Sequence, residues 1–362
     1  MNKLNVAVVY GGVSPEHEVS KSSAASVVAH MREEKYNVMP VYVTREGKWL
    51  MYDGKIDNVS NIQWDKFGTP AVLSPDASHR GLLRLVGGKV KVVPVDVIFP
   101  LIHGRNGEDG TMQGLFEVSG VPYVGCGVLA SAVAMDKTFG KLVAASLGLR
   151  QADYLVFSEY ELADMDEAAK KSRYKIGYPC FVKPANSGSS VGISKACNKR
   201  ELVAAFELAA RYDNKVIVEK AVAGRELECA VLELSEGGAE ASAVGEIIAN
   251  ADFYDFDAKY NSEDSQTIVP ADIPKEYGDE VRGQAVKMFR AIGGRGLARV
   301  DFFLEQETNR VIFNEINTIP GFTAISLYPK LWRERGVRLQ ELIDRLILLG
   351  IIHSERRKTL NG

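Results

Sequence analysis

The chain has 362 residues, of which 46% are hydrophobic and 25% charged, and its 44 basic residues nearly balance 47 acidic ones, for a net charge of -3. This composition excludes disordered and collagen-like chains. It also lacks the positive field typical of nucleic-acid-binding proteins. At about 150 residues per domain, the length indicates two or three domains.

The sequence shows no clear secretory signal, membrane helix or cysteine motif. Near the N-terminus only residues 6–10 form an apolar run, whereas a secretory signal needs a longer apolar core. No apolar run approaches the roughly 18 residues of a membrane helix. The four cysteines show no CxxC spacing, which argues against a zinc site or redox dithiol and favours a reducing compartment. We expect a cytoplasmic protein with neither membrane nor nucleic-acid partner.

The first hundred residues predict a parallel α/β sheet. Strands are expected at 4–10, 36–44 and 92–101. A helix is expected from Ser14–Pro15 to about Met31, because serine followed by proline is typical of an N-cap and first helical position. Strands that alternate with helices favour a parallel sheet. The stretch 51–90 carries the turn residues of a small antiparallel insertion.

The remaining chain mixes helices with paired strands. Helices are expected at 136–147, 159–173, 199–212, 273–291 and 339–349, and strands at 152–157, 180–183, 191–196, 215–219, 226–234 and 243–248. A hairpin is expected at 297–317. The stretch 250–270 is polar and aromatic, and a loop of this length in a compact domain is usually functional, for example as a lid. Residues 354–362 are expected to form a frayed tail.

The hairpin carries a candidate metal site. In LARVDFFLE, side chains alternate between the two faces, so Arg299 and Asp301 share one face. The antiparallel return strand should bring Glu315 and Asn317 within about a residue of Asp301. Carboxylate and amide oxygens suit Mg²⁺ better than zinc. The alternative is a solvated hairpin face with scattered charges.

The phosphate-binding signals are indirect, because neither a Walker A motif nor a GxGxxG fingerprint is present. Lys183 ends an apolar strand and precedes the small-residue loop 186–190, whose backbone N–H groups could cover phosphates. Lys137 lies near a helix start. In isolation, Lys183 could instead reach the surface along its apolar stem, and Lys137 could be an ordinary solvated lysine.

Two further segments could carry function. Glu16 lies in the first turn of a helix, where compensation of the helix dipole is a common alternative role. His103 opens a glycine-rich segment after a buried strand, at the sheet edge where ligands gather in α/β proteins; a structural histidine is the alternative. The strand that ends at Glu219 leads into the connector 220–224, which could present backbone groups to a flat base or be an ordinary turn.

Eight segments together resemble the motif series of the D-alanine–D-alanine ligases, ATP-grasp enzymes of cell-wall precursor synthesis. They are GGVSPEHEVS (11–20), HGRNGEDGTMQG (103–114), MDK (135–137), VKPANSGSSVG (182–192), EKAVAGRE (219–226), YDFDAKY (254–260), RVDFF (299–303) and NEINTIPGFTAISLYP (314–329). Each match is weak alone, but they occur in order and span nearly the whole chain, about residues 5–350.

The resemblance implies an α/β protein, α+β in its C-terminal part, with three domains around a central cleft: an N-terminal domain followed by two ATP-grasp lobes. An N-terminal open parallel sheet over 1–132 would take the first D-alanine. A central lobe over 133–222 would carry the phosphate loop. A C-terminal lobe over 223–362 would carry the lid, the metal site and the pocket of the second D-alanine. The family also implies a homodimer.

The resemblance assigns ATP contacts along the chain. The residues matched to ATP-binding positions are Lys137, Lys183, Ser189, Glu219, Lys220, Ala221, Val222, Glu226, Lys259 and Asn314. Among these, Ala221 and Val222 would act through backbone groups, Glu226 would bind the ribose, and Lys259 would reach the γ-phosphate from the lid. Asp301, Glu315 and Asn317 match ligands of two Mg²⁺ ions, bridged by Glu315, for which Mn²⁺ can substitute.

Substrate roles follow from the same comparison. The residues matched to D-alanine sites or to catalysis are Glu16, Val19, His103, Ser189, Tyr260, Arg299, Gly321, Ser326 and Leu327. Glu16 would hold the ammonium of the first D-alanine, and with Ser189 and Tyr260 it would form a hydrogen-bonded set. The Arg299 side chain and the Gly321 amide would stabilise the oxyanion. Ser326 and Leu327 would line the second pocket.

The implied reaction joins two D-alanine molecules through a D-alanyl phosphate, with release of ADP and phosphate. A ligase that joins D-alanine to D-serine or D-lactate is the nearer alternative, and a catalytically idle ATP-binding module the more distant one. Tyr260 favours an amine nucleophile, although a tyrosine there is also compatible with D-serine, and Leu327 favours the methyl group of D-alanine. Ala221 replaces the bulky aromatic residue of many relatives, and Ile325 replaces a frequent histidine, a change we cannot interpret.

Overall fold

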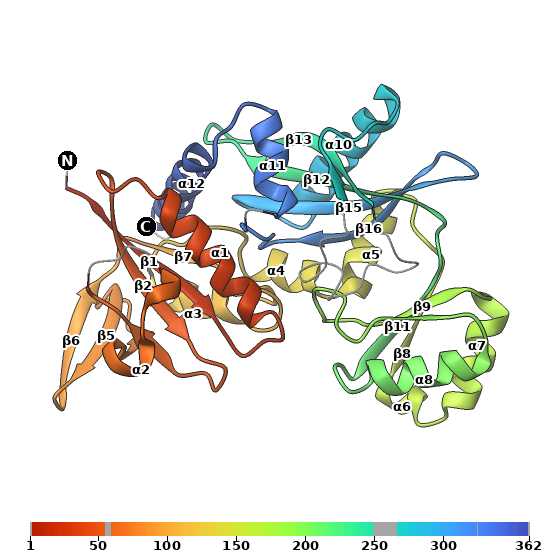
Figure 1. The fold of residues 1–362 in the computed structure, drawn as a ribbon, viewed down its shortest axis with the longest axis horizontal. Coiled ribbons are helices and arrows are strands. Elements are labelled where there is room, and N and C mark those ends of the chain that lie inside the picture. Colours follow the sequence, from red (N-terminus) through yellow and green to blue (C-terminus); the bar gives the residue numbers. More distant parts are fainter. Residues whose placement is uncertain (1, 55–58, 249–265, 324, 361–362) are drawn as a thin grey trace.

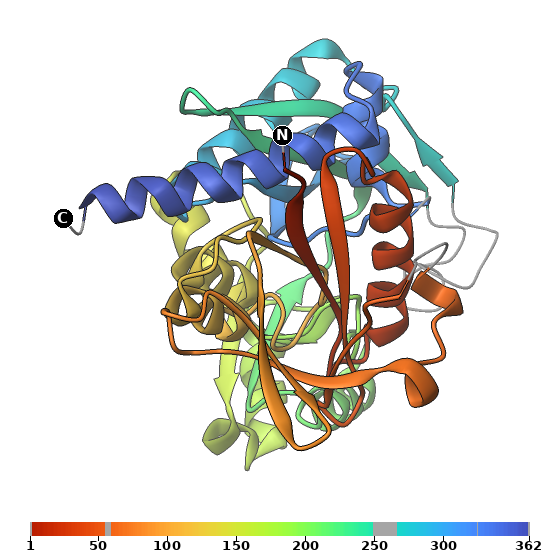
Figure 2. The ribbon, with the colours of Figure 1, turned by 90° about the vertical axis from the view of Figure 1, so that its left-hand side faces the viewer.

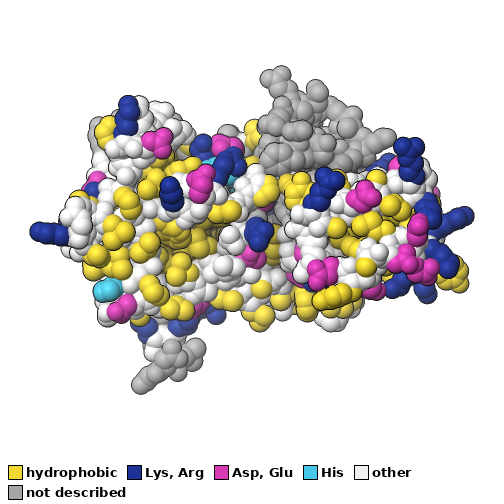
Figure 3. All heavy atoms as spheres, turned by 90° about the horizontal axis from the view of Figure 1, so that it is seen from below, with side chains coloured by type: hydrophobic (Ala, Val, Ile, Leu, Met, Phe, Trp, Pro, Cys, Tyr) yellow, Lys and Arg dark blue, Asp and Glu magenta, His cyan; other side chains and the backbone are white. Residues whose placement is uncertain are grey.

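Three β-sheets organise the chain (Figure 1). The structure is a computed structural model that describes residues 2–54, 59–248, 266–323 and 325–360. The three sheets follow one another along the sequence, and helices cover them. Within these described ranges, no helix combines the length and apolar character needed to cross a membrane. On the face drawn in Figure 3, basic and acidic side chains are intermixed, in keeping with the small net charge.

The N-terminal sheet has seven strands in the order β6-β5-β4-β3-β2-β1-β7. Their bounds are β1 Leu4–Gly11, β2 Tyr36–Val43, β3 Trp49–Met51, β4 Thr69–Leu73, β5 Gly81–Val86, β6 Lys89–Pro94 and β7 Val97–Pro100. As predicted, β1 pairs in parallel with β2 and β7, and the insertion adds antiparallel strands. The predicted strand at 92–101 is in fact two strands. After Pro94, the Asp96 amide bonds to Asn5 O, so the chain leaves β5 and joins β1.

The helices of this part lie over and beside the sheet. They are α1 His17–His30, the 3₁₀ turn Val59–Asn61, α2 Trp64–Phe67 and α3 Thr111–Ser119. The prediction that Ser14 caps α1 is wrong. The Ser14 hydroxyl accepts from the Glu16 amide at 3.1 Å, which makes a turn before the helix, and Glu16 itself is the N-cap residue.

The central sheet has four antiparallel strands in the order β10-β9-β11-β8. They are β8 Tyr154–Ser158, β9 Cys180–Pro184, β10 Ser194–Ala196 and β11 Lys215–Lys220. Three helices, α6 Glu159–Leu162, α7 Met165–Lys175 and α8 Lys199–Ala209, accompany the sheet. The strand predicted from residue 191 begins only at Ser194, because residues 189–192 form a turn.

The third sheet has five strands in the order β14-β13-β12-β15-β16. They are β12 Gly224–Glu233, β13 Ala239–Ile248, β14 Gln266–Ile268, β15 Leu297–Glu305 and β16 Val311–Asn317. The helices α4 Val128–Met135, α5 Lys137–Ser146 and α10 Lys275–Ala291 share a hydrophobic core with this sheet. Thus α4 and α5, although they precede the central sheet in the sequence, pack against β16 of the third sheet.

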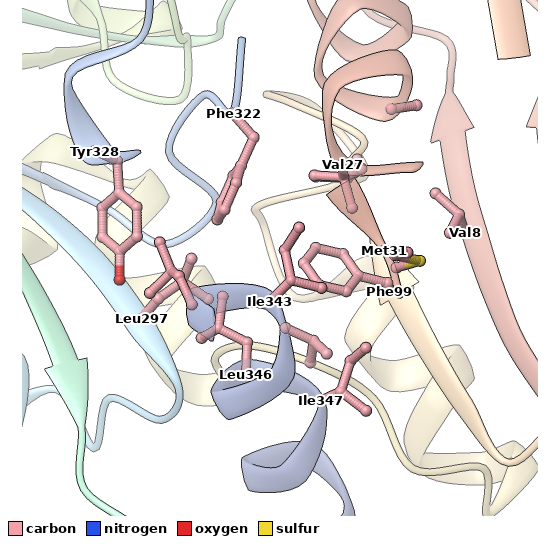
Figure 4. Close-up of a cluster of buried hydrophobic side chains, with 14 of the residues drawn as sticks. Val8, Val27, Met31, Phe99, Leu297, Phe322, Tyr328, Ile343, Leu346 and Ile347 are labelled. Carbon is pink, nitrogen blue, oxygen red and sulfur yellow. The ribbon is translucent and has the colours of Figure 1, made fainter. Parts of the chain in front are cut away.

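A second hydrophobic core joins the third sheet to the first. It includes α11 Leu327–Glu334 and α12 Leu339–Leu360. Figure 4 shows Ile343 and Leu346 of α12 between Leu297 of β15 on one side and Phe99 of β7 on the other. In Figure 2, α12 runs past the N-terminal strands. The predicted frayed tail is wrong for residues 354–360, because α12 continues through them.

Candidate active site

A cavity of about 660 Å³ lies between the central and the third sheet. Its lining includes most residues that the sequence assigns to ATP, namely Lys137, Lys183, Ser189, Glu219, Lys220, Ala221, Val222, Glu226 and Asn314. Phe181, Ile193 and Phe303 contribute apolar walls. The cavity therefore combines an apolar part, suited to a flat ring, with lysines and carboxylates that suit phosphates and a cation.

Glu219 is buried between two lysines. Its carboxylate lies 2.5 Å from Lys183 Nζ and 2.8 Å from Lys141 Nζ. Burial opposes the charged form, yet the two lysines lower the pKa of Glu219 to about 2. Lys141 is only 2% exposed and was missed by the sequence reasoning. The available signal was its position four residues after Lys137, on the same face of α5.

Lys137 joins three segments of the chain. Its ammonium donates to Ser187 O at 2.7 Å and lies 3.2 Å from Glu315 Oε2. Helix α5 begins at Lys137 because Asp136 caps it, accepting from the backbone N–H groups of Thr138 and Phe139. This cap fixes the lysine between the glycine-containing loop and β16.

The predicted hairpin register is confirmed. Asp301 pairs with Glu315, and Arg299 pairs with Asn317. Arg299 donates to both oxygens of Asp301, each at 2.7 Å, and Asn317 Nδ2 donates to Asp301 Oδ2 at 3.0 Å. Burial acts against the charged guanidinium, but Asp301 and then Glu228 raise the pKa of Arg299. A carboxylate, an amide and a second carboxylate thus meet beside the cavity.

The donor set at the hairpin fits a hard divalent cation, since Asp301 and Glu315 offer carboxylate oxygens and Asn317 offers an amide oxygen on two neighbouring strands. Among the described residues, no group of three or more His, Cys, Asp or Glu side chains forms a metal cluster. Such a site would need further oxygen ligands from a bound phosphate or from water, which is common for Mg²⁺.

Glu16 contacts the loop 186–190 that follows β9. The Ser189 hydroxyl donates to Glu16 Oε1. Two glycines make room for this carboxylate: a Cβ atom at Gly104 would lie 2.0 Å from Glu16 Oε2, and one at Gly188 would lie 2.5 Å from it. Ser189 and Ser190 have positive φ angles, 46° and 60°, a strained conformation for serine that the surrounding contacts must hold.

His103 is buried, with 3% of its surface exposed. Its ring nitrogens lie 2.9 Å from Ser23 Oγ and 2.9 Å from Ile319 O. Burial lowers the pKa of His103 to about 4, so the ring is neutral near pH 7. These contacts tie the first sheet to the loop after β16.

Glu108, which the sequence reasoning did not assign, is buried near His103. It accepts from the amides of Gly104 at 2.8 Å and Ile319 at 2.9 Å. Burial first, and then Glu16, raises the pKa of Glu108. An acid inside the segment HGRNGEDG was the only available signal.

The other predicted residues that the structure describes lie in the loop after β16, in α11 and in α1. Ser326 precedes α11, and its hydroxyl accepts from Thr323 N at 3.1 Å; a Cβ at Gly321 would lie 2.6 Å from that hydroxyl. Leu327 is 6% exposed and packs in the core that joins the first and third sheets, and Val19 of α1 is also buried. Lys259 and Tyr260, with the predicted lid up to residue 265, lie outside the described residues.

Known proteins are similar to this chain over nearly its whole length. Residues 5–126 match the family model described as D-ala D-ala ligase N-terminus, and residues 143–348 match the D-ala D-ala ligase C-terminus model. A D-alanine–D-alanine ligase of Caldicellulosiruptor bescii is 47% identical over 361 residues, which are 99% of this chain and 98% of that protein.

Two solved structures are similar over nearly all of the chain. The VanG D-Ala:D-Ser ligase of Enterococcus faecalis is 37% identical with a TM-score of 0.86, and the match covers 96% of this chain and 100% of that one. The D-alanine–D-alanine ligase of Coxiella burnetii is 32% identical with a TM-score of 0.86, covering 99% and 97%.

Proposed function

The chain belongs to the D-alanine–D-alanine ligase family, and we propose from this premise how its residues perform the reaction. The protein is an ATP-dependent ligase of the ATP-grasp fold. It joins two D-alanine molecules into D-alanyl-D-alanine for peptidoglycan precursor synthesis and releases ADP and phosphate. The observation that supports these residue roles best is the meeting of Lys137, Lys183 and Glu315 at one 660 Å³ cavity.

The cavity binds ATP with its base toward the connector after β11. The Ala221 amide donates to Pro179 O at 3.1 Å, so the base is expected to bond to the Ala221 carbonyl and the Val222 amide. Lys220 and Glu226 line the same cavity, which supports the proposed binding of the ribose by Glu226. Lys183 and Lys137 hold the phosphates with Ser189 and Asn314, and Lys259 reaches the γ-phosphate from the lid.

Asp301, Glu315 and Asn317 would hold Mg²⁺, with two ions expected, or Mn²⁺ in its place. When bound, the metal neutralises charge on the transferring phosphoryl group. Lys137 lies 3.2 Å from Glu315 and contributes a fixed positive charge at the same point. Lys137, together with a cation on the carboxylates, would hold the γ-phosphate near Glu315.

Glu16 holds the ammonium of the first D-alanine, whose carboxylate takes the γ-phosphoryl group and becomes an acyl phosphate. The amine of the second D-alanine then attacks the carbonyl carbon. Arg299 and the Gly321 amide stabilise the tetrahedral oxyanion. The C–O bond to phosphate breaks as the peptide bond forms. The amine's proton goes either to the Ser189–Tyr260–Glu16 set or to the departing phosphate.

We propose that the acceptor is D-alanine, with D-serine as the second candidate. Leu327 presents an apolar side chain next to Ser326, which favours the methyl group of D-alanine. The similarity to the VanG D-Ala:D-Ser ligase keeps D-serine as the second candidate. His103 and Val19 line the side of the first D-alanine, so the acceptor preference is expected to come from the loop after β16.

The reaction is tested with purified protein, ATP, Mg²⁺ and D-alanine, by measuring phosphate release together with product mass. D-serine and D-lactate serve as competing acceptors, and L-alanine as the stereochemical control. Dominant D-alanyl-D-alanine is the expected product. A dominant mixed product would contradict the acceptor assignment, and absence of D-alanine-dependent phosphate release would contradict the proposed roles as a whole.

We further propose a cytoplasmic homodimer with three units, 1–132, 133–222 and 223–362. The absence of a basic field and the intermixed surface charges favour small-molecule partners over nucleic acid. Because α4 and α5 pack on β16, the boundary between the second and third units is expected to involve residues 128–146 as well. Light scattering tests the dimer, and limited proteolysis tests the unit boundaries.

A further inference from the structure

Glu228 completes a row of three carboxylates across the third sheet. It lies on β12 opposite Asp301 of β15, and Asp301 lies opposite Glu315 of β16. Paired residues of neighbouring strands point to the same face of a sheet, so the three acids share the face that carries the proposed metal site. Glu228 is only 6% exposed, and none of the roles above uses it.

Arg299 stands between two members of this row. Its Nε atom lies 2.7 Å from Asp301 Oδ1 and 3.0 Å from Glu228 Oε2, and its Nη2 atom lies 2.7 Å from Asp301 Oδ2. The guanidinium therefore occupies both oxygens of Asp301, the same atoms that a divalent cation would ligate. Two positive groups at one carboxylate repel each other strongly in a buried site.

Arg299 and a metal ion would therefore compete for Asp301, and Glu228 offers Arg299 a second carboxylate. We propose that Glu228 is a positioning residue that anchors Arg299 when Asp301 binds the divalent metal, so that the guanidinium shifts toward Glu228 and stays beside the reacting carbonyl. This inference rests on the proposed metal and oxyanion roles of Asp301 and Arg299. Without the Glu228 charge, Arg299 would hold Asp301 more tightly and compete with the metal.

Metal binding without turnover tests the proposal. Mn²⁺ binding to the full-length protein with ADP is measured by electron paramagnetic resonance. Glu228→Gln should weaken Mn²⁺ binding about tenfold, since it removes one charged partner of a buried group. Glu233→Gln is the matched control. Glu233 lies on the same strand, but its carboxylate pairs with His353 at 2.7 Å, so its removal should leave Mn²⁺ binding unchanged.

A double variant separates positioning from simple charge attraction. In an Arg299→Met background, Glu228→Gln should change Mn²⁺ binding less than twofold, because the competing guanidinium is gone. An equal tenfold loss in both backgrounds would show that Glu228 acts only by its electric field and would overturn the proposal. No loss in the single variant would overturn it as well.

A wrong metal assignment can be told apart from a wrong role for Glu228. If Asp301→Asn leaves Mn²⁺ binding intact, the metal assignment itself is wrong. Should Glu228→Gln fail to fold, as judged by circular dichroism, Glu228→Asp keeps the charge on a shorter side chain and carries the test. The shorter side chain reaches Arg299 less well, so Glu228→Asp should weaken Mn²⁺ binding, by less than the tenfold expected of Glu228→Gln, and should lower kcat. Unchanged Mn²⁺ affinity and kcat would contradict the anchoring role.

Discussion

The Ser189 hydroxyl donates a hydrogen bond to the Glu16 carboxylate, which lies 173 positions earlier in the chain. This bond connects the loop after β9 of the central sheet with the turn before α1, next to the N-terminal sheet. We propose that Glu16 holds the ammonium of the first D-alanine and that Ser189 contacts the ATP phosphates. With these proposed roles, the contact would couple the position of the loop 186–190 to the first substrate site.

Replacement of Ser189 tests this coupling. Ser189→Ala should lower kcat/KM for D-alanine by about tenfold or more, since a hydrogen bond to a charged group is worth roughly 1.5–3 kcal/mol. Ser187→Ala is the control, because the Ser187 hydroxyl donates to Val191 O within the loop. Steady-state kinetics measure kcat/KM, and a thermal melt checks that both variants fold. An equal loss of kcat/KM in both variants would contradict a specific role for the Ser189–Glu16 bond.

The glycines around Glu16 give a steric prediction. Gly188→Ala would place a Cβ atom 2.5 Å from Glu16 Oε2, so the carboxylate must move and D-alanine binding should weaken at least about tenfold, with little change in melting temperature. Gly114→Ala, on α3, would place its Cβ atom in open space with no neighbour within 4 Å, and it should stabilise the protein slightly. Calorimetric titration with D-alanine checks both variants, and unaltered affinity in Gly188→Ala would be the contrary result.

Lys141 is predicted to support the Lys183–Glu219 pair. Lys141→Met removes one of the two cations at the buried Glu219 carboxylate and should lower the free energy of unfolding by about 2 kcal/mol. In the Lys141→Met/Glu219→Gln double variant the loss should be smaller than the sum of the single losses, because the unmatched charge is also gone. Urea unfolding at pH 7 measures the cycle, and strict additivity would contradict the coupling.

His103 makes a pH prediction. Burial lowers its pKa from the ordinary 6.5 to about 4. Between these values the unfolded chain binds a proton that the folded chain does not, so His103 makes the folded state less stable as pH falls from 6.5 to 4. In His103→Gln, the free energy of unfolding should fall less over this range than in the original chain.

The exposed His30 provides the comparison for this experiment. His30→Gln should keep the pH dependence of the original chain, because folding does not bury the His30 ring. Denaturant unfolding at several pH values between 4 and 7 checks the pair. Parallel stability curves for His103→Gln and the original chain would rule out the buried neutral ring.

Local sequence patterns predicted the hairpin that carries the site, but they did not predict which side chains form ion pairs there. The period of two along residues 299–303 gave the hairpin register that pairs Asp301 with Glu315. The helix start at Ser14 was wrong, because the same serine hydroxyl can instead close a turn with the Glu16 amide. Lys141 and Glu228 were missed, since their partners lie 78 and 71 positions away at Glu219 and Arg299.

By itself, the sequence determined the family, many of the strands and helices, and the residue types needed for phosphate transfer, because these depend on local periodicity and on short motifs. It did not predict the helices α3, α4 and α11. Only the tertiary structure decided which charges neutralise one another. Arg299 lies against both Asp301 and Glu228, and Lys141 shares Glu219 with Lys183. The reason is physical: a buried charge is stabilised by whichever opposite charge the packing of separate elements brings within a few ångströms, and sequence spacing does not encode that distance.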